Sequence, residues 1–210
     1  MIKIEALKVG LLSANCYIVY DQETLEGMVI DPGGNPEIIL EYVKNFELNI
    51  TRILLTHGHG DHIAGVEGVA KALKVPVWVH KNDKELMEDG TKNLSVMLHI
   101  GDITYDADVY FDESSSMEFL GQQVKIIHTP GHTPGSVSFL IGSDLFVGDT
   151  LFFHSIGRSD LYAGNFDDLE KSIQEKIYTL DESIKIYPGH GPQTNVGEEM
   201  KNNSYIKKRA

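Results

Sequence analysis

The sequence predicts an α/β fold, and two observations support this prediction. Short apolar segments with strand character alternate with amphipathic helical segments along the chain. Turns rich in glycine, proline and histidine directly follow several of the apolar segments, which is where open α/β proteins bind ligands. The length of 210 residues is enough for one well-buried domain, so we expect residues 1–210 to form a single domain.

The amino-terminal third is predicted to be a set of strands followed by a helix. Candidate strands cover residues 2–9, 15–20 and 27–31, and an amphipathic helix covers 36–46. The apolar face of this helix is expected to contain Ile38, Ile39, Tyr42, Val43 and Phe46. Asp31 precedes a Pro-Gly-Gly turn, and we interpret it as a turn-capping residue, with a functional role as the alternative.

The segment between a predicted strand at 51–55 and a predicted helix at 63–73 contains three histidines and one carboxylate within six residues. Imidazole and carboxylate groups are the usual ligands of a borderline divalent metal. In extended chain His57 and His59 can point the same way, whereas Asp61 and His62, at the helix start, can turn toward a second position. The intervening glycines, 58 and 60, would permit a tight path with positive φ. Because four such ligands cannot easily reach one ion, the segment predicts two metals.

The middle of the chain gives a weaker pattern. Residues 75–80 predict a short strand, with His80 just beyond it on the surface. The segment 81–106 mixes charged residues with methionine and leucine. It is equally compatible with a lid that sets substrate choice and with a helical excursion on the surface.

The carboxyl-terminal half returns to strands and places further polar residues at their ends. Strands are predicted at 107–111, 117–120 and 123–128, a hairpin at 136–142 and 144–148, a helix at 166–180, a strand at 184–187 and a terminal helix at 196–208.

Two loops of this half are rich in proline and glycine, and each holds one histidine, His132 or His190. Asp149 follows an apolar strand, where a carboxylate is costly to bury unless it is paired or bound to metal, although a cap of the following loop is the alternative. His128 is expected to be packed or hydrogen-bonded. Arg158 is a candidate for holding an anionic substrate group, and pairing with Asp160 is the alternative.

Together these residues resemble the complete ligand set of the metallo-β-lactamase superfamily. The resemblance implies an α/β four-layer αββα sandwich and a dinuclear metal centre. It implies that His57, His59 and His132 hold the first metal, that Asp61, His62 and His190 hold the second, and that Asp149 bridges them. A hydroxide between the ions would be the nucleophile. The two carboxylates of the set, Asp61 and Asp149, are the expected catalytic residues.

Within the superfamily, the segments 148–152, 157–160 and 188–192 resemble the short bacterial type of glyoxalase II-like hydrolase. The implied reaction is hydrolysis of S-lactoylglutathione or another S-acyl thiol. A thiolate leaves with a conjugate pKa of about 8.5 and needs no dedicated general acid, which favours thioesters over amides. Zinc is the expected metal, and iron and manganese are alternatives. Glyoxalase II has a lysine and a tyrosine where this chain has Arg158 and Asp160, which leaves open a thiol carrier other than glutathione.

A rival within the same fold is a persulfide dioxygenase. The resemblance then implies one Fe(II) held by His57, His132 and Asp149, because two histidines and one carboxylate with open positions suit oxygen activation.

Composition excludes several other classes of function. The formal charge of −13 opposes binding to nucleic acid, and no long apolar run predicts a membrane span or a signal peptide. A single cysteine, Cys16, allows no internal disulfide, and we expect it to be buried and inert. The expected protein is therefore a cytoplasmic enzyme with a small-molecule substrate, and the sequence gives no oligomeric state.

Overall fold

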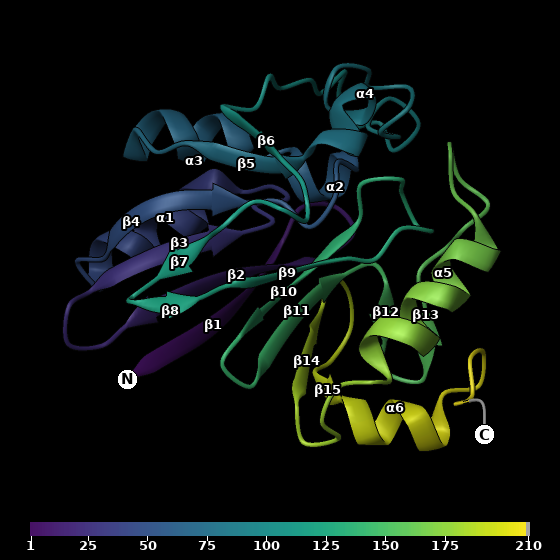
Figure 1. Ribbon diagram of the computed structural model, residues 1–210. Coiled ribbons are helices and arrows are strands. Elements are labelled where there is room, and N and C mark those ends of the chain that lie inside the picture. The colour runs from purple at the N-terminus through teal and green to yellow at the C-terminus, as the bar shows by residue number, and fades with distance from the viewer. Residues whose placement is uncertain (209–210) are drawn as a thin grey trace. The chain divides into compact units, whose positions relative to one another are not determined.

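The computed structural model describes residues 1–208, which divide into two compact units, Met1–Phe111 and the chain from Asp112 onward. Each unit is a sheet with helices packed against it (Figure 1). The single domain predicted for residues 1–210 stays a prediction. None of the helices in the described part of the chain is long and apolar enough to cross a membrane.

The first unit is built on a six-stranded sheet with the order β1-β2-β3-β4-β5-β6. Its first three strands are antiparallel neighbours, and β3 to β6 are parallel. Its strands and helices are β1 (Ile2–Val9), β2 (Ala14–Asp21), β3 (Glu26–Ile30), α1 (Pro36–Asn45), β4 (Asn49–Leu54), α2 (Gly60–Ile63), α3 (Val66–Leu73), β5 (Val77–His80), a 3₁₀ turn (Lys81–Asp83), α4 (Lys84–Met87) and β6 (Val109–Phe111).

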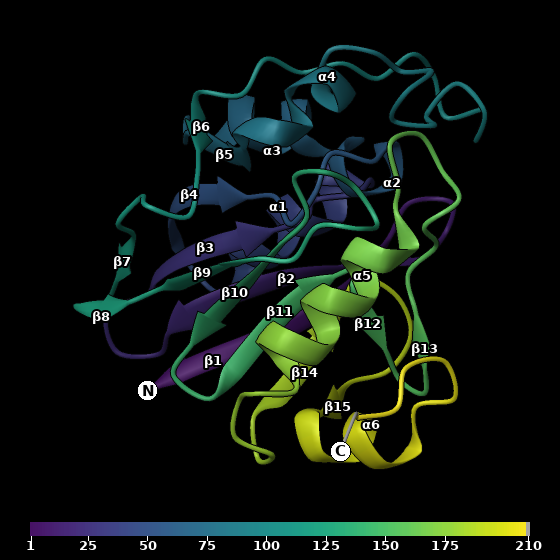
Figure 2. The ribbon, with the colours of Figure 1, turned by 45° about the vertical axis from the view of Figure 1, so that its right-hand side comes forward.

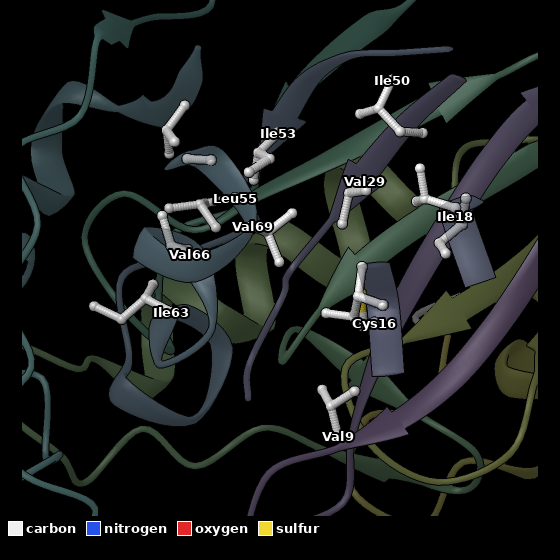
Figure 3. Close-up of a cluster of buried hydrophobic side chains, with 14 of the residues drawn as sticks. Val9, Cys16, Ile18, Val29, Ile50, Ile53, Leu55, Ile63, Val66 and Val69 are labelled. Carbon is white, nitrogen blue, oxygen red and sulfur yellow. The ribbon is translucent and has the colours of Figure 1, made fainter. Parts of the chain in front are cut away.

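The core of this unit joins one face of the sheet to its helices. Figure 3 shows apolar side chains from the strands, such as Val29 and Ile53, gathered near Ile63, Val66 and Val69 of α2 and α3. Complete burial of such side chains stabilises the unit by about 1.5 to 3 kcal/mol each. Cys16 is fully buried in the same cluster, and burial raises the pKa of its thiol well above the ordinary value. The predicted burial of Cys16 is therefore confirmed.

Two predictions for the helices of this unit need correction. The predicted helix 63–73 is two helices, because the chain breaks at Gly65, whose N–H donates to the Pro32 carbonyl at 2.8 Å. On α1 only Ile39 and Val43 are buried, whereas Ile38 is 42% exposed and Phe46 is 46% exposed. The helix ends at Asn45, so Phe46 lies outside it and stacks on Tyr42. Its apolar face is therefore narrower than the sequence predicted.

The second unit is built on a five-stranded sheet with the order β15-β14-β11-β10-β9. The pair β11 and β14 is parallel, and the other pairs are antiparallel. Its strands and helices are β7 (Glu118–Phe119), β8 (Gln122–Gln123), β9 (Lys125–His128), β10 (Val137–Ile141), β11 (Asp144–Gly148), β12 (Leu151–Phe152), β13 (Ser155–Ile156), α5 (Phe166–Ser172), a π-helical turn (Ile173–Ile177), β14 (Lys185–Pro188), β15 (Thr194–Asn195) and α6 (Val196–Asn202).

The core of the second unit lies between this sheet and its helices. Leu169 and Ile173 from α5 and the following turn pack with Leu145, Val147 and Ile186 from the strands. Figure 2 shows α5 lying over the strands of this sheet. Asn165 caps α5 by accepting a hydrogen bond from the Asp168 N–H at 3.1 Å. The predicted strands of this half are present, and the one predicted at 107–111 is β6 of the first unit. The predicted helix 166–180 is wrong in its length and type, because the α-helix ends at Ser172 and a π-helical turn continues only to Ile177. The terminal helix is also shorter than predicted and ends at Asn202.

Candidate metal centre

The predicted metal-binding segment of the first unit follows β4 and enters α2. Its four polar residues are buried, at 0% exposed for His57 and His62, 2% for His59 and 8% for Asp61. The ring centroid of His57 lies 4.9 Å from that of His59 and 4.2 Å from that of His62. His62 Nε2 lies 3.8 Å from Asp61 Oδ2. The local sequence therefore gathers four donor groups into one buried cluster.

A carboxylate from the neighbouring parallel strand fixes this cluster. Asp31 follows β3, and its Oδ1 accepts from the Thr56 N–H at 2.8 Å. Its Oδ2 accepts from Thr56 Oγ1 at 2.6 Å and lies 3.0 Å from His62 Nδ1. With Nδ1 donating to Asp31, His62 keeps Nε2 as its donor atom toward a metal. Asp31 therefore orients a predicted ligand.

The sequence interpretation of Asp31 as a turn cap missed this orienting role. The signal that could have found it is the parallel pairing of β3 with β4, which brings the ends of both strands to one edge. Asp31, His57 and His62 also have ligand atoms within 4.8 Å of one another. Because both Asp31 oxygens already accept hydrogen bonds, we assign it to orientation rather than to metal ligation.

A second set of contacts braces the backbone of the metal-binding segment. The Gly58 N–H donates to Asp83 Oδ2 at 2.9 Å, and the Gly60 N–H donates to the Asn93 carbonyl at 2.7 Å. A Cβ atom at Gly60 would lie 2.7 Å from Cβ of Ser95. Neither glycine has positive φ, so that reason given from sequence is wrong. Close packing against the 81–106 segment accounts for Gly60, and Gly58 is held by its bond to Asp83.

The 81–106 segment is thus not a helical excursion over most of its length, and its role as a lid that sets substrate choice stays a prediction. It begins with one 3₁₀ turn and the short α4, and it continues as loops. Asn93 is fully buried and donates to the carbonyls of Leu86 and Ile103 at 2.8 Å each. The segment is therefore tied internally as well as to the metal-binding loop.

Three further predicted ligands lie in the second unit, each after a strand. His132 is 3% exposed in the loop after β9, Asp149 follows β11, and His190 follows β14. Asp149 Oδ2 lies 3.6 Å from His132 Nε2 and 3.7 Å from His190 Nε2. One carboxylate oxygen therefore lies between two imidazole nitrogens, as a bridging ligand requires.

The loop around His132 holds its ring in one orientation. His132 Nδ1 lies 2.6 Å from the carbonyl oxygen of Arg158, to which it donates when Nε2 serves as the ligand atom. The loop closes on itself through the Thr129 N–H, which donates to the Ser136 carbonyl at 2.8 Å. A Cβ atom at Gly157 would collide with the carbonyl oxygen of Asp149. This glycine lets the segment that holds His132 run against the segment that carries Asp149.

The side chain of Arg158 forms the pair that the sequence offered as its alternative. Its Nε and one terminal nitrogen donate to the two Asp160 oxygens at 2.9 Å each, and both side chains are more than half exposed. The guanidinium lowers the pKa of the Asp160 carboxyl, and the carboxylate raises the pKa of Arg158. Its role in substrate binding stays a prediction.

For two other histidines, one prediction is confirmed and the other is wrong. His128 lies 2.8 Å from the Pro134 carbonyl and 2.7 Å from Glu113, which confirms a hydrogen-bonded role. His80 was expected on the surface, but it is fully buried. Its Nδ1 accepts from the Asn82 N–H at 3.3 Å, and its ring packs edge-on against Phe111. The strand β5 thus ends on a buried residue.

The chemistry of the donor sets fits divalent metal ions. Each unit offers imidazole nitrogens and carboxylate oxygens, and within each unit a second group fixes at least one ring. This combination suits zinc, iron and manganese, and it lacks the thiolates that select softer metals.

Comparison with known proteins agrees with this geometry. Residues 9–190 match the family described as the metallo-beta-lactamase superfamily. The chain is 36% identical over 207 residues to the probable metallo-hydrolase YqgX of Bacillus subtilis, covering 97% of each chain. It is 32% identical over 219 residues to hydroxyacylglutathione hydrolase GloC of Haemophilus influenzae, covering 99% of each.

Solved structures give the same result. BLEG-1 B3 metallo-beta-lactamase superposes with a TM-score of 0.92 at 37% identity, over 98% of this chain and 99% of that one. TTHA1623 in a di-iron-bound form superposes with a TM-score of 0.86 at 33% identity, over 96% of this chain and 100% of that one. ETHE1 from Myxococcus xanthus superposes with a TM-score of 0.82 at 25% identity, over 97% of this chain and 84% of that one. These matches confirm the predicted α/β fold class, and the chain belongs to the metallo-β-lactamase superfamily.

Proposed function

We propose that this protein is a metal-dependent thioester hydrolase that acts on S-lactoylglutathione or another S-acyl thiol. The observation that carries the proposal is the position of Asp149 Oδ2 between the Nε2 atoms of His132 and His190, because one oxygen shared by two histidines is what a dinuclear centre needs. The similarity to GloC over nearly the whole chain supports the substrate class.

The proposed assignment of ligands to the two ions follows the family resemblance. As the family resemblance implies, His57, His59 and His132 would hold one ion, Asp61, His62 and His190 would hold the other, and Asp149 would bridge. When bound, the two ions would lower the pKa of water toward 7 and polarise the thioester carbonyl. Zinc is our proposed metal, and iron or manganese are the alternatives that the donor set accepts.

The chain's own residues keep the ligands in their reactive orientation. Asp31 holds the Nδ1 proton of His62, and the Arg158 carbonyl holds that of His132, so each ring presents Nε2. Thr56 Oγ1 donates to Asp31 and can accept from His57 Nδ1, which lies 3.1 Å away. The thiolate product leaves without a dedicated acid, since its conjugate pKa is about 8.5.

The substrate proposal extends to the exposed Arg158. Its guanidinium is held in place by Asp160, and it would attract a carboxylate of an anionic thiol such as glutathione. The net charge of −13 supports a small-molecule substrate rather than nucleic acid.

The first test combines metal content with thioester turnover. Protein purified without chelator is expected to contain two ions per chain and to hydrolyse S-lactoylglutathione or an S-acyl N-acetylcysteamine. A chelator should abolish turnover, and adding zinc should restore it. Two bound ions with no turnover of any thioester, but with hydrolysis of a β-lactam such as nitrocefin, would overturn the substrate class.

A second candidate is a persulfide dioxygenase, which the similarity to ETHE1 favours. In that reading His57, His132 and Asp149 would hold a single iron, as two histidines and one carboxylate do in oxygen-activating enzymes. One iron per chain with oxygen uptake on addition of glutathione persulfide, and no thioester turnover, would select it.

A further inference from the structure

A cavity in the first unit opens beside one of the proposed metal ligands. It has a volume of about 440 Å³, and Asp61 and Ala64 lie in its wall. Leu11 and Leu12 line it from the turn between β1 and β2, and Leu98 and Ile100 line it from the 81–106 segment. The volume lies within the range of about 300 to 1,000 Å³ that ligand pockets occupy.

The wall that carries Leu11 and Leu12 is held against the turn after β3. The Gly10 N–H donates to Asn35 Oδ1 at 2.8 Å. A Cβ atom at Gly34 would lie 2.7 Å from the Cα atom of Gly10, so the two backbones touch. This side of the cavity therefore has a fixed frame, although its two leucines project into solvent.

The opposite wall is tied to the metal-binding segment itself. The Asn93 carbonyl accepts from the Gly60 N–H, and Asn93 Oδ1 accepts from the Ser95 N–H at 3.0 Å. The Ile100 N–H in turn donates to the Ser95 carbonyl at 3.1 Å. The position of Leu98 and Ile100 is thus coupled, through a buried asparagine, to the residue that precedes Asp61.

The chemistry of the lining is apolar with one acidic group. Among the described residues that line it, Asp61 is the only ionisable one, and none is a lysine, arginine or histidine. Leu11 is 69% exposed and Leu12 is 45% exposed, which leaves apolar surface in water at the mouth of the cavity. Apolar surface gathered at a cavity mouth marks a binding site more often than scattered single residues do.

We propose that this cavity binds the acyl chain of the thioester substrate and that Leu11, Leu12, Leu98 and Ile100 set its length. The proposal rests on the thioester hydrolase function proposed above. The acyl side fits better than the thiol side, because glutathione carries two carboxylates and the lining offers no cation to meet them. An acyl group larger than lactoyl and less polar is therefore the preferred substrate class.

The test is a series of S-acyl N-acetylcysteamine thioesters, from acetyl to octanoyl, given to the metal-loaded protein. Each buried methylene contributes enough transfer free energy for a gain of up to about fourfold in binding. We expect kcat/KM to rise by about two- to fourfold for each methylene until the cavity is full. A flat series, or one that falls from acetyl onward, would overturn the proposal.

A binding measurement gives a second readout that does not depend on turnover. S-Hexyl-N-acetylcysteamine is a thioether, so it cannot be hydrolysed, and its affinity can be measured by calorimetry. The Leu12→Asp variant places a charge in the lining, and it should weaken this ligand by at least about tenfold. Leu98→Ala should weaken it less, because it removes contacts without adding a charge.

Met97→Asp is the matched control. Met97 is 57% exposed in the same segment as Leu98, and it does not line the cavity. It should leave both thioether affinity and the acyl-chain preference unchanged. Equal effects of Leu12→Asp and Met97→Asp would overturn the assignment of the cavity.

The two proposals fail in distinguishable ways. If no thioester is hydrolysed but the thioether binds and Leu12→Asp weakens it, the thioesterase function is wrong and the apolar site stands. If short thioesters are hydrolysed but the thioether does not bind, the function stands and the acyl pocket is wrong.

Discussion

The two units supply their candidate metal ligands in different ways. In the first unit the four ligands are close together in the sequence, in one segment of six residues that runs from the loop after β4 into α2. In the second unit each ligand comes from a different loop, after β9, β11 or β14. The first group depends on local backbone and its braces, whereas the second depends on how three strands pair. Perturbations should therefore affect the two groups differently.

The largest expected effect comes from the shared oxygen of the second group. Asp149→Asn replaces a carboxylate that lies within 3.7 Å of both His132 and His190. Hydrolysis should fall by more than the 10- to 100-fold that loss of an orienting partner costs. Metal content per chain should fall as well, as measured by elemental analysis.

The matched control for Asp149→Asn is Asp144→Asn. Asp144 begins the same strand, β11, and accepts a hydrogen bond from the Tyr187 hydroxyl at 3.0 Å. This variant should keep its metals and its turnover. Full activity of Asp149→Asn would show that this carboxylate is not part of the metal centre.

Substitution of the glycines that pack against the backbone of Asp61 and Asp149 should give the next largest effect, and here the two units should behave alike. A Cβ atom at Gly33 would collide with the carbonyl of Asp61, as one at Gly157 would with the carbonyl of Asp149. Because a backbone carbonyl cannot move aside, each change to alanine should lower the free energy of unfolding by about 2 to 3 kcal/mol.

Urea denaturation of both glycine variants measures this loss. Gly121→Ala is the control, since a Cβ atom there meets nothing within 4 Å and only its φ of +70° is unfavourable. It should cost about 1 kcal/mol. A smaller loss at Gly33 or Gly157 than at Gly121 would contradict the close approach.

Orientation of the histidines should distinguish the two groups. In the first, a side chain holds His62, so Asp31→Asn can remove the support. Both Asp31 oxygens accept hydrogen bonds, so an amide NH₂ must face a donor whichever way it turns. Metal affinity should fall by about 10- to 100-fold, measured by competition with a chromogenic chelator.

Asp89→Asn serves as the control for Asp31→Asn. Asp89 lies on the surface of the same unit and accepts from the Thr91 and Lys92 N–H groups at 2.8 and 3.2 Å. Its replacement should not change metal affinity. Equal metal affinity of Asp31→Asn and the unmodified protein would show that His62 needs no such support.

The same contrast explains what the sequence could predict. The histidine-rich segment, with its residue types and spacing in consecutive positions, and the strands at 2–9, 15–20 and 144–148 follow from local pattern. The roles of Asp31 and Asn93 do not, because they depend on β3 lying beside β4 and on a loop folding back onto Gly60. The burial of His80 was missed for the same reason. Local pattern predicted the donor groups, and tertiary pairing supplied what orients them.

Substitution of Arg158 should give the smallest effect. It tests the side chain alone, because the backbone carbonyl of residue 158, which supports His132 in the second group, is kept. The ring of His132 is held by the Arg158 carbonyl, so Arg158→Gln should leave metal content unchanged. The exposed pair with Asp160 contributes at most about 1 kcal/mol to stability. If the guanidinium also binds an anionic thiol, Arg158→Gln should raise KM for S-lactoylglutathione severalfold and leave KM for an uncharged N-acetylcysteamine thioester unchanged.

Asp160→Asn breaks the same pair but keeps the cation, so it should not raise KM for the anionic substrate. Parallel increases in both variants would mean that the pair only fixes the loop.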